Sequence, residues 1–215
     1  YIHTITEALK LAFGDREAYY GDPDFSDIPL NGLLSSSYAS ERLKLIDHKK
    51  ALAEQAIAGH PDHQTKQTPS QRIPKAHTKG SCGDHDANAS GTTHIATADN
   101  LGNMACGTIS GGAFNKSVFF PELGCCLSTR IEMFNNVEGH PNVVEPKKRP
   151  RTTLVNYIVL ENGTPTMTFG CPGGDNQAQA NLQLVLNVLI FGMNPQEAVE
   201  APRFSSQNVV NSFFP

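Results

Sequence analysis

The first hydrophobic pattern of the chain has a helical period. Apolar side chains recur every three or four residues, while Glu7 and Lys10 fall between them. Such spacing places one apolar stripe on one side of a helix and the charged residues on the other. We therefore expect an amphipathic helix over residues 3–14, with Glu7 and Lys10 turned toward solvent. Its apolar positions are Ile2, Ile5, Leu9, Ala12 and Phe13.

A second helical pattern follows a run of serines at residues 35–37. A serine side chain accepts a hydrogen bond from an unpaired backbone N–H of the first helical turn, so this run predicts a helix start. The pattern extends from about Tyr38 to Ala58, with Leu43 and Ile46 predicted to face inward. Residues 1–58 thus form a helical front part that carries no chemistry of its own.

Residues 59–91 are dominated by polar residues, proline and glycine. This segment has too little apolar surface to offset the entropy of ordering it, so we expect a flexible linker. Histidines and one cysteine in it raise the question of a zinc site. Their spacing matches no compact set of ligands, and we predict no metal. These residues are His60, His63, His77, Cys82 and His85.

Beyond the linker the pattern changes to the period of two that is typical of strands. Alternation predicts a strand over 93–98, a turn over 100–103 and a returning strand over 104–109. The segment 110–112, Ser-Gly-Gly, is expected to be a loop near a site.

A second hairpin is predicted from residues 152–160 and 164–169 about the turn residues Asn162 and Gly163. After it, helices are predicted over 176–191 and over a short segment that begins near 194. A helical front and a strand-rich remainder indicate an α+β fold class.

Composition bounds the possible partners. The chain has 215 residues, 39% of them hydrophobic and 18% charged, which is typical of a globular protein. Its net charge of -4 argues against a nucleic acid, which binds a basic face. The longest apolar stretch, 182–191, is far shorter than the roughly 20 residues of a membrane span. The compartment stays open between cytoplasmic and periplasmic or secreted.

The five cysteines, an odd number that includes the adjacent pair Cys125 and Cys126, do not form a disulfide framework. Buried free thiols are expected. Because the chain has no initiator methionine and opens within a predicted helix, we also expect it to be part of a longer protein.

The first candidate for chemistry is Thr92, which follows Gly91 at the end of the linker. If the Gly91–Thr92 bond is cut, Thr92 carries both a nucleophilic hydroxyl and an α-amine. That amine has a pKa of roughly 8 and can act as base to the hydroxyl. The alternative is that Thr92 merely begins a strand.

The second candidate is the glycine pair Gly173 and Gly174 before the long predicted helix. Backbone N–H groups at a helix N-terminus can hold an oxyanion. The alternative is a tight turn with Asp175 as the helix cap.

Several motifs in order resemble those of the γ-glutamyltranspeptidase family of N-terminal-nucleophile hydrolases, over nearly the whole chain except 59–91. The motifs are Leu11–Arg16, Gly21–Phe25, Thr92-Thr93-His94 with Asp99, Gly102 and Asn103, Lys148-Arg149-Pro150, Thr152-Thr153, Pro172-Gly173-Gly174 and Ala201–Phe204.

The resemblance implies a proenzyme that cuts itself between Gly91 and Thr92 into a large and a small chain, folded together as an αββα four-layer sandwich. Residues 1–58 would be the helical end of the large chain, 59–91 the linker before the cleavage point, and 92–215 the small-chain part with the nucleophile. No cofactor is implied. The implied partners are a small amide substrate, such as glutathione or another γ-glutamyl amide, and the remainder of the large chain. A homodimer of processed heterodimers is left open.

The resemblance also assigns roles to residues. Thr92 would be the nucleophile, and Ser110 stands where the family has a threonine that hydrogen-bonds it. Gly173 and Gly174 match the oxyanion-hole glycines. Thr152 and Thr153 stand where the family has a serine pair that contacts the substrate.

The chain departs from the family pattern at the acyl-binding positions. Gly112 replaces an asparagine that contacts the substrate, and of an acidic pair that binds the glutamyl amine only Glu132 remains, beside Met133. Arg130 nearby favours a carboxylate or another anionic acyl group. Two alternatives to a γ-glutamyl enzyme therefore stay open: an acylase or amidase with a different acyl group, and an inactive member that serves as a structural or binding module.

Overall fold

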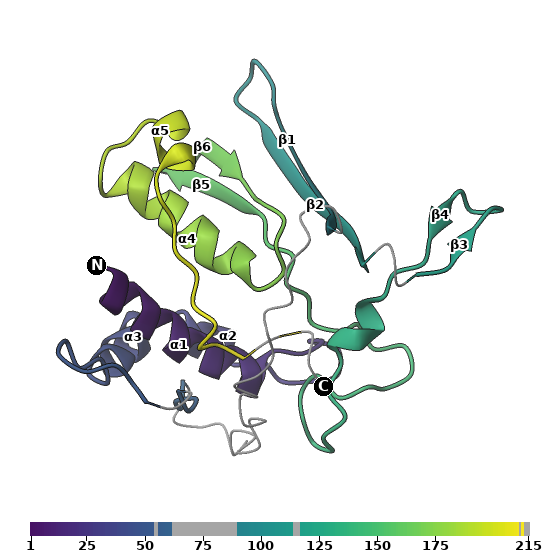
Figure 1. Ribbon diagram of the computed structural model, residues 1–215, viewed down its shortest axis with the longest axis horizontal. Helices are drawn as coiled ribbons and strands as arrows, with labels where there is room; N and C mark the ends of the chain where they lie inside the picture. The colour runs from purple at the N-terminus through teal and green to yellow at the C-terminus, as the bar shows by residue number, and fades with distance from the viewer. Residues whose placement is uncertain (54–55, 62–89, 114–116, 211, 213–215) are drawn as a thin grey trace. The chain divides into compact units, whose positions relative to one another are not determined.

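A computed structural model of the chain combines helices with antiparallel strands, in agreement with the predicted α+β class (Figure 1). It describes residues 1–53, 56–61, 90–113, 117–210 and 212. The chain divides into two compact units. The first comprises Tyr1–Ser81, Ile131–Arg151 and Ser206–Pro215, and the second comprises Cys82–Arg130 and Thr152–Ser205.

Helix α1 (Ile2–Tyr19) in the first unit is longer than predicted, and its charged residues are not where they were expected. Glu7 and Lys10 are 1% and 4% exposed, whereas the apolar Ile2 and Ala12 are exposed. Lys10 Nζ lies 2.7 Å from Glu7 Oε1, and the pair binds both backbone groups of Leu52, at 2.8 and 3.0 Å. Burial is tolerated because every charge has a partner.

Helix α2 (Leu30–Leu33) precedes α3 (Ser36–Leu43). The predicted cap is confirmed, because Ser35 Oγ accepts from Tyr38 N at 3.2 Å. The predicted extension to residue 58 is wrong. The helix ends in backbone hydrogen bonds of the tighter i→i−3 type. Beyond it, Asp47 Oδ1 accepts from the backbone N of residue 49, and this side-chain bond competes with a helical backbone bond. Ile46 packs inward as predicted, but Leu43 is exposed.

Buried polar contacts hold the chain at Gly59, where the front part ends. Asp15 Oδ1 accepts from Tyr38 Oη at 2.8 Å and from Gly59 N at 2.9 Å, and Tyr19 Oη donates to Gly59 O at 2.6 Å. Burial raises the pKa of Asp15. A Cβ on Gly59 would lie 2.5 Å from Tyr38 Oη, so only glycine fits.

Residues 21–25 of the predicted motif form a turn, which is bound by an arginine far along the chain. Asp22 Oδ1 accepts from Arg149 Nη2 at 2.6 Å, and Asp22 Oδ2 accepts from Arg149 Nε at 3.0 Å and from its backbone N at 2.8 Å. A further bond of 2.7 Å joins Arg149 to Asp24. These hydrogen bonds hold the pKa of Asp22 well below its usual range.

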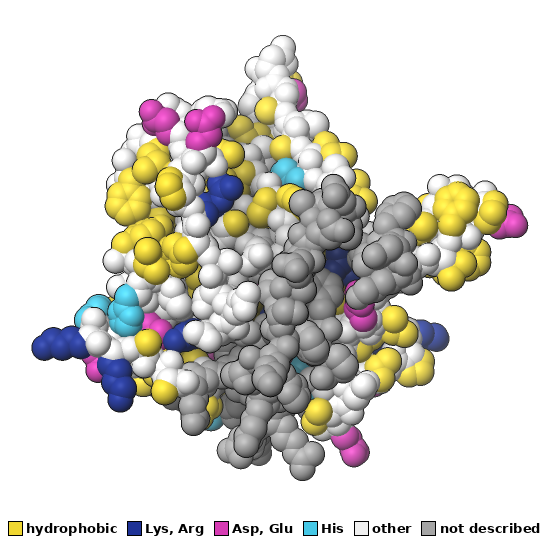
Figure 2. Space-filling model, in the orientation of Figure 1, with side chains coloured by type: hydrophobic (Ala, Val, Ile, Leu, Met, Phe, Trp, Pro, Cys, Tyr) yellow, Lys and Arg dark blue, Asp and Glu magenta, His cyan; other side chains and the backbone are white. Residues whose placement is uncertain are grey.

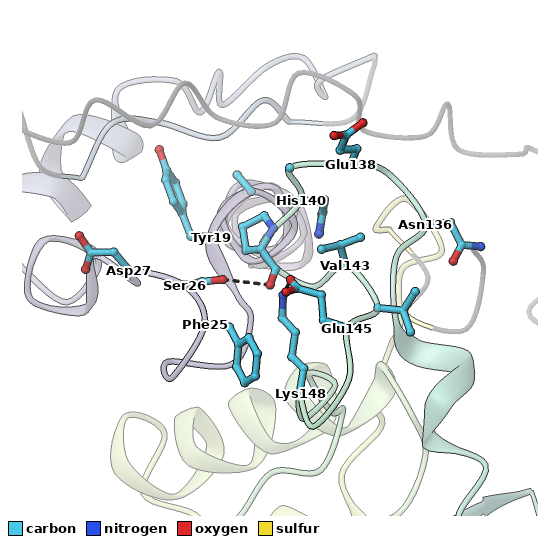
Figure 3. Close-up of a pocket in the computed structure, with 14 residues that line it drawn as sticks. Tyr19, Phe25, Ser26, Asp27, Asn136, Glu138, His140, Val143, Glu145 and Lys148 are labelled. Carbon is cyan, nitrogen blue, oxygen red and sulfur yellow. Dashed lines mark hydrogen bonds and ion pairs between the residues drawn. The ribbon is translucent and has the colours of Figure 1, made fainter.

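The first unit contains a cavity of about 580 Å³ between the 18–27 and 136–148 segments (Figure 3). Several of its polar side chains are bonded to neighbouring groups. Ser26 Oγ donates to Pro141 O at 3.1 Å, and Lys148 Nζ lies 2.8 Å from Glu145 Oε1. His140 Nδ1 accepts from the backbone N of residue 142, and burial lowers the pKa of His140. No residue of the predicted site lines this cavity.

In the second unit, β1 (Ser90–Ala98) pairs antiparallel with β2 (Met104–Ala113). The turn between them is closed by Asp99 Oδ1, which accepts from the backbone N atoms of residues 101 and 103, each at 2.9 Å. The two predicted strands are confirmed, but the loop predicted over 110–112 is wrong. That segment stays in β2 because β1 continues opposite it, with an irregularity between Ser90 and Thr92.

The second hairpin consists of β5 (Tyr157–Glu161) and β6 (Thr164–Phe169). Asn162 and Gly163 have φ values of 51° and 84°, as a two-residue hairpin turn requires. The predicted start of this hairpin at residue 152 is wrong. Side chains outside the hairpin take the backbone groups of Val155, as described below, so that segment cannot continue the ladder.

The remaining helices are η2 (Arg130–Met133), α4 (Asn176–Leu189) and α5 (Pro195–Glu200). The buried face of α4 is polar, and Gln183 binds both backbone groups of Phe204. Apolar side chains are instead exposed at the end of α4 and around β3 (Phe119–Phe120) and β4 (Cys125–Cys126), as Figure 2 shows. They include Leu189, Ile190, Phe191, Val118, Phe119, Leu123 and Leu127.

Four cysteines lie among the described residues, and all four are free thiols, as predicted. Burial was predicted wrongly for Cys125, which is exposed, while Cys106, Cys126 and Cys171 are partly exposed. None of the helices in the described part of the chain is long and apolar enough to cross a membrane.

Candidate functional site

The centre of the predicted site is a cross-strand pair. Thr92 in β1 stands directly opposite Ser110 in β2, and Thr92 Oγ1 donates a hydrogen bond of 3.0 Å to Ser110 Oγ. Both side chains are partly buried. The strand ladder therefore fixes the hydroxyl of Thr92 against a second hydroxyl.

A second polar pair lies two residues further along the same face, because side chains alternate between the faces of a strand. His94 stands opposite Thr108, and His94 Nδ1 lies 2.9 Å from Thr108 Oγ1. Thr108 Oγ1 also donates toward Val155 O at 3.2 Å and Asn156 Oδ1 at 2.6 Å. Thr108 was not among the predicted site residues, and His94 was expected only as part of the strand and motif that follow Thr92. Their two-residue spacing from Ser110 and Thr92 nevertheless predicts the shared face.

Thr152 and Thr153 precede the Val155 segment. Thr153 is 5% exposed, and its Oγ1 has no hydrogen-bond partner among the described residues. Thr152 is exposed, and its Oγ1 accepts from the backbone N of residue 154 at 3.1 Å. Val155 N donates to Gln177 Oε1 at 3.2 Å, which ties this segment to the first turn of α4.

Gly173 and Gly174 lead into α4 with φ values of 128° and 54°, in the region that favours glycine. Their carbonyls accept from the backbone N atoms of Asn176 and Gln177, at 2.9 and 3.1 Å. Within the part of the chain that is described, neither glycine N–H has an acceptor. Asp175 is the N-cap residue but makes no side-chain cap bond. Two backbone donors thus stand available at the positive end of a helix.

The positions predicted to bind the acyl group fall in both units. Arg130 ends one segment of the second unit, where its backbone N donates to Ser128 Oγ at 3.2 Å. Just before it, Thr129 N donates to Gly111 O at 2.7 Å. Glu132, which is partly buried, and Met133 belong to the first unit, and Met133 is only 2% exposed.

The structure therefore brings Thr92 together with Ser110 and links the Thr153 segment to the glycine turn through Gln177. Glu132 belongs to the first unit and Thr92 to the second. Among the residues the structure describes, no group of three or more His, Cys, Asp or Glu side chains could hold a metal. His63, His77, Cys82 and His85 of the rejected zinc set lie outside those residues.

Comparison with known proteins identifies one family. The sequence model of the family described as Gamma-glutamyltranspeptidase matches residues 1–214. The chain is 30% identical over 209 residues to the "Glutathione hydrolase proenzyme" of Bacillus subtilis (strain 168), covering 95% of this chain and 34% of that protein. It is 30% identical over 203 residues to the "Acylase ACY 1 proenzyme" of Pseudomonas sp. (strain SE83), covering 94% of this chain and 32% of the relative.

A solved structure is also similar. The cephalosporin acylase from Bacillus halodurans superposes with a TM-score of 0.73 at 31% identity, over 94% of this chain and 32% of that one. The chain thus spans about a third of the length of the relatives it matches. These matches confirm the resemblance that the motifs predicted.

Proposed function

Because this chain belongs to the gamma-glutamyltranspeptidase family, we propose that it carries the catalytic threonine of an amide-cleaving enzyme that processes itself before Thr92. The observation that supports this most is the Thr92–Ser110 hydrogen bond, since the family pattern has the nucleophile and its hydroxyl partner at these two positions. The word "proenzyme" in the names of both relatives supports the processing step.

Processing would begin with attack of Thr92 Oγ1 on the carbonyl carbon of Gly91. The C–O ester forms as the C–N bond breaks, and the hydroxyl proton passes to the nitrogen, which becomes the α-amine of Thr92. Water then hydrolyses the ester, leaving a carboxylate on Gly91 and the restored hydroxyl on Thr92. Gly91 favours this step because a residue without Cβ tolerates the distorted backbone that the attack needs.

Turnover would use the same hydroxyl. The free α-amine accepts the proton of Thr92 Oγ1 while the oxygen attacks the substrate amide carbon, and Ser110 orients the oxygen. The N–H groups of Gly173 and Gly174 would stabilise the oxyanion of the tetrahedral intermediate. The amine product leaves with the proton, and water or a second amine then takes the acyl group from Thr92.

The identity of the acyl group distinguishes two candidate functions, a γ-glutamyl enzyme and an acylase with a different acyl substrate. Thr153 Oγ1, buried and without a partner among the described residues, supports contact of the threonine pair Thr152 and Thr153 with the substrate. A γ-glutamyl group also needs acids for its ammonium, which Glu132 alone would supply. An acylase function with a different acyl group is favoured by Met133 at the second acidic position and by Arg130, which attracts a carboxylate. The acylase names of two relatives support this second candidate.

The remainder of the large chain would complete the fold. We propose that residues 1–58 end the large chain, that 59–91 link it to the cleavage point, and that 92–215 contribute to one αββα four-layer sandwich with the missing part. The exposed apolar side chains of α4 and of the β3–β4 hairpin support this, because contiguous apolar surface is typical of an interface.

Mass spectrometry of freshly made full-length protein tests the proposal. We expect two chains, the smaller one beginning at Thr92. Thr92→Ala should remain one inactive chain, and Thr92→Ser should split more slowly. The matched control is Thr93→Ala, a change at the exposed neighbour on the opposite face of β1, which should process normally. Cleavage of Thr92→Ala at this bond would refute autocatalysis, and an intact, inactive wild type would favour the structural or binding module.

A further inference from the structure

We propose that His94 and Thr108 are positioning residues, which hold the nucleophile hairpin, the Thr153 segment and the glycine turn in one geometry. The inference rests on the proposed function and adds to it a specific junction of side chains. Neither residue is assigned to touch the reacting atoms. They act through the segments that carry Thr92, Thr153 and Gly174.

The direction of the hydrogen bonds is set by Thr108. Its hydroxyl has one hydrogen, and two of its neighbours, Val155 O and Asn156 Oδ1, are acceptors at 3.2 and 2.6 Å. The Thr108 hydroxyl therefore donates to those oxygens, and His94 Nδ1, at 2.9 Å, must donate to Thr108 Oγ1. Since Thr108 is 8% exposed, water has little access to replace any of these bonds.

The same histidine ring sets the position of the strand that leads to the glycine turn. A Cβ built on Gly170 would lie 2.4 Å from His94 Nδ1 and 2.5 Å from its Cε1. The backbone of Gly170 thus packs directly against the imidazole. Gly170 immediately follows β6 and stands three residues before Gly173, so the ring is a spacer between β1 and the oxyanion turn.

A second route reaches the turn from its other side. Val155, whose carbonyl accepts from Thr108, donates its N–H to Gln177 Oε1, and Gln177 N donates to Gly174 O at 3.1 Å. The His94–Thr108 pair therefore contacts both the approach to the turn at Gly170 and, through Val155, the first turn of α4. A catalytic geometry that is misplaced by about 1 Å can lose on the order of 100-fold in rate.

Kinetics of the full-length enzyme on a chromogenic anilide test the proposal. His94→Ala should lower kcat by about 10- to 100-fold with KM changed by less than about threefold, because the oxyanion is held only in the transition state. His94→Asn should recover most of kcat, since its Nδ2 can stand near the place of Nδ1 and donate to Thr108. Thr97→Ala, at an exposed position of β1, is the control and should leave kcat unchanged.

A double substitution distinguishes a positioning role of His94 from a general loss of stability. Gly170→Ala alone should lower kcat, because the new Cβ displaces the imidazole. In the His94→Ala background the same change should cost little more, since the ring is gone. Additive losses from the two changes, or an Asn variant as impaired as Ala while melting temperatures match, would overturn the proposal.

A readout independent of activity keeps the proposal testable if the proposed function fails. In long-range ¹H–¹⁵N spectra of the wild type, the His94 Nδ1 should carry a hydrogen, and Thr108→Val should change that signal. An Nδ1 without hydrogen would refute the pair even in an active enzyme. Cleavage of Thr92→Ala before residue 92 would refute the proposed function while leaving the pair intact.

Discussion

Thr92 and Ser110 face each other across β1 and β2, and the hydroxyl of the first donates to that of the second over 3.0 Å. The hydrogen bond is a consequence of register. Because the turn that begins at Asp99 pairs Ala98 with Met104, each step outward along both strands leads to Thr92 opposite Ser110. The strand pairing itself thus orients the proposed nucleophile.

Removal of the Ser110 hydroxyl should slow both the cleavage before Thr92 and the hydrolysis of substrate. We expect Ser110→Ala to lower both rates by about 10- to 100-fold, since a hydrogen bond to a group that develops charge contributes about 1.5–3 kcal/mol. Ser110→Thr keeps the hydroxyl and should stay within about threefold of the wild type. The rates can be measured from the disappearance of the uncut chain and from anilide hydrolysis. Equal activity of the Ala variant would show that Ser110 does not orient Thr92.

Substitution of Gly174 should be harmful for two separate reasons, namely its backbone conformation and its N–H group. At its φ of 54° an alanine costs about 1–2 kcal/mol of stability. We expect Gly174→Ala to lose in addition at least about tenfold in kcat, because a shifted N–H no longer stabilises the oxyanion. Denaturant unfolding and steady-state kinetics measure the two effects.

The matched control is Gly163→Ala in the β5–β6 turn, where φ is 84° and no atom crowds the added Cβ. It should lose a similar amount of stability and keep its kcat. If both glycine variants lose activity in proportion to stability, the turn before α4 has no special role in the chemistry.

Acid should weaken the contact between Asp22 and Arg149. The pKa of Asp22 in the folded protein lies below its ordinary value of 3.8, because Arg149 donates to both carboxylate oxygens. A depressed pKa stabilises the fold above the ordinary value, and this contribution is lost as pH falls through the folded one. The Tm difference between wild type and Asp22→Asn should therefore be constant above about pH 5 and shrink below about pH 4. In the Arg149→Gln background, which lacks the donating guanidinium, the same Tm difference should lose this trend.

Local rules predicted the elements whose ends are set by neighbouring residues. The β1–β2 hairpin, the Asn162–Gly163 turn and the Ser35 cap each follow from side chains within a few positions. The predictions were wrong where a residue far away in the sequence determines whether a side chain is buried or an element ends. Glu7 and Lys10 are buried because residue 52 supplies both backbone groups that they bind.

The same distinction holds for the site. The Thr92–Ser110 pair and the two glycines were predicted through the resemblance, whereas the strand pattern alone ended at residues 93 and 109 and made 110–112 a loop. The segment before β5 was predicted as part of the strand that leads to the Asn162–Gly163 turn, whereas in the structure Gln177 and Thr108 bind the backbone of Val155. No local sequence pattern predicts these contacts, because they join residues that are 22 and 47 positions apart.

The last prediction concerns the acyl group. A γ-glutamyl group carries an ammonium and a carboxylate. Loss of a partner for a buried charge costs about 3–5 kcal/mol, which is on the order of 100-fold or more in binding. Met133 is apolar and 2% exposed, so it offers an ammonium nothing, whereas Arg130 would repel an ammonium and attract a carboxylate. We therefore expect the complete enzyme to hydrolyse a glutaryl anilide, which lacks only the amine, with a higher kcat/KM than the γ-glutamyl anilide. Met133→Asp should move the ratio toward the γ-glutamyl compound, with Ile131→Asp, at an exposed neighbour, as the control. A clear wild-type preference for the γ-glutamyl anilide would mean that Glu132, or an acid from the rest of the large chain, binds the ammonium.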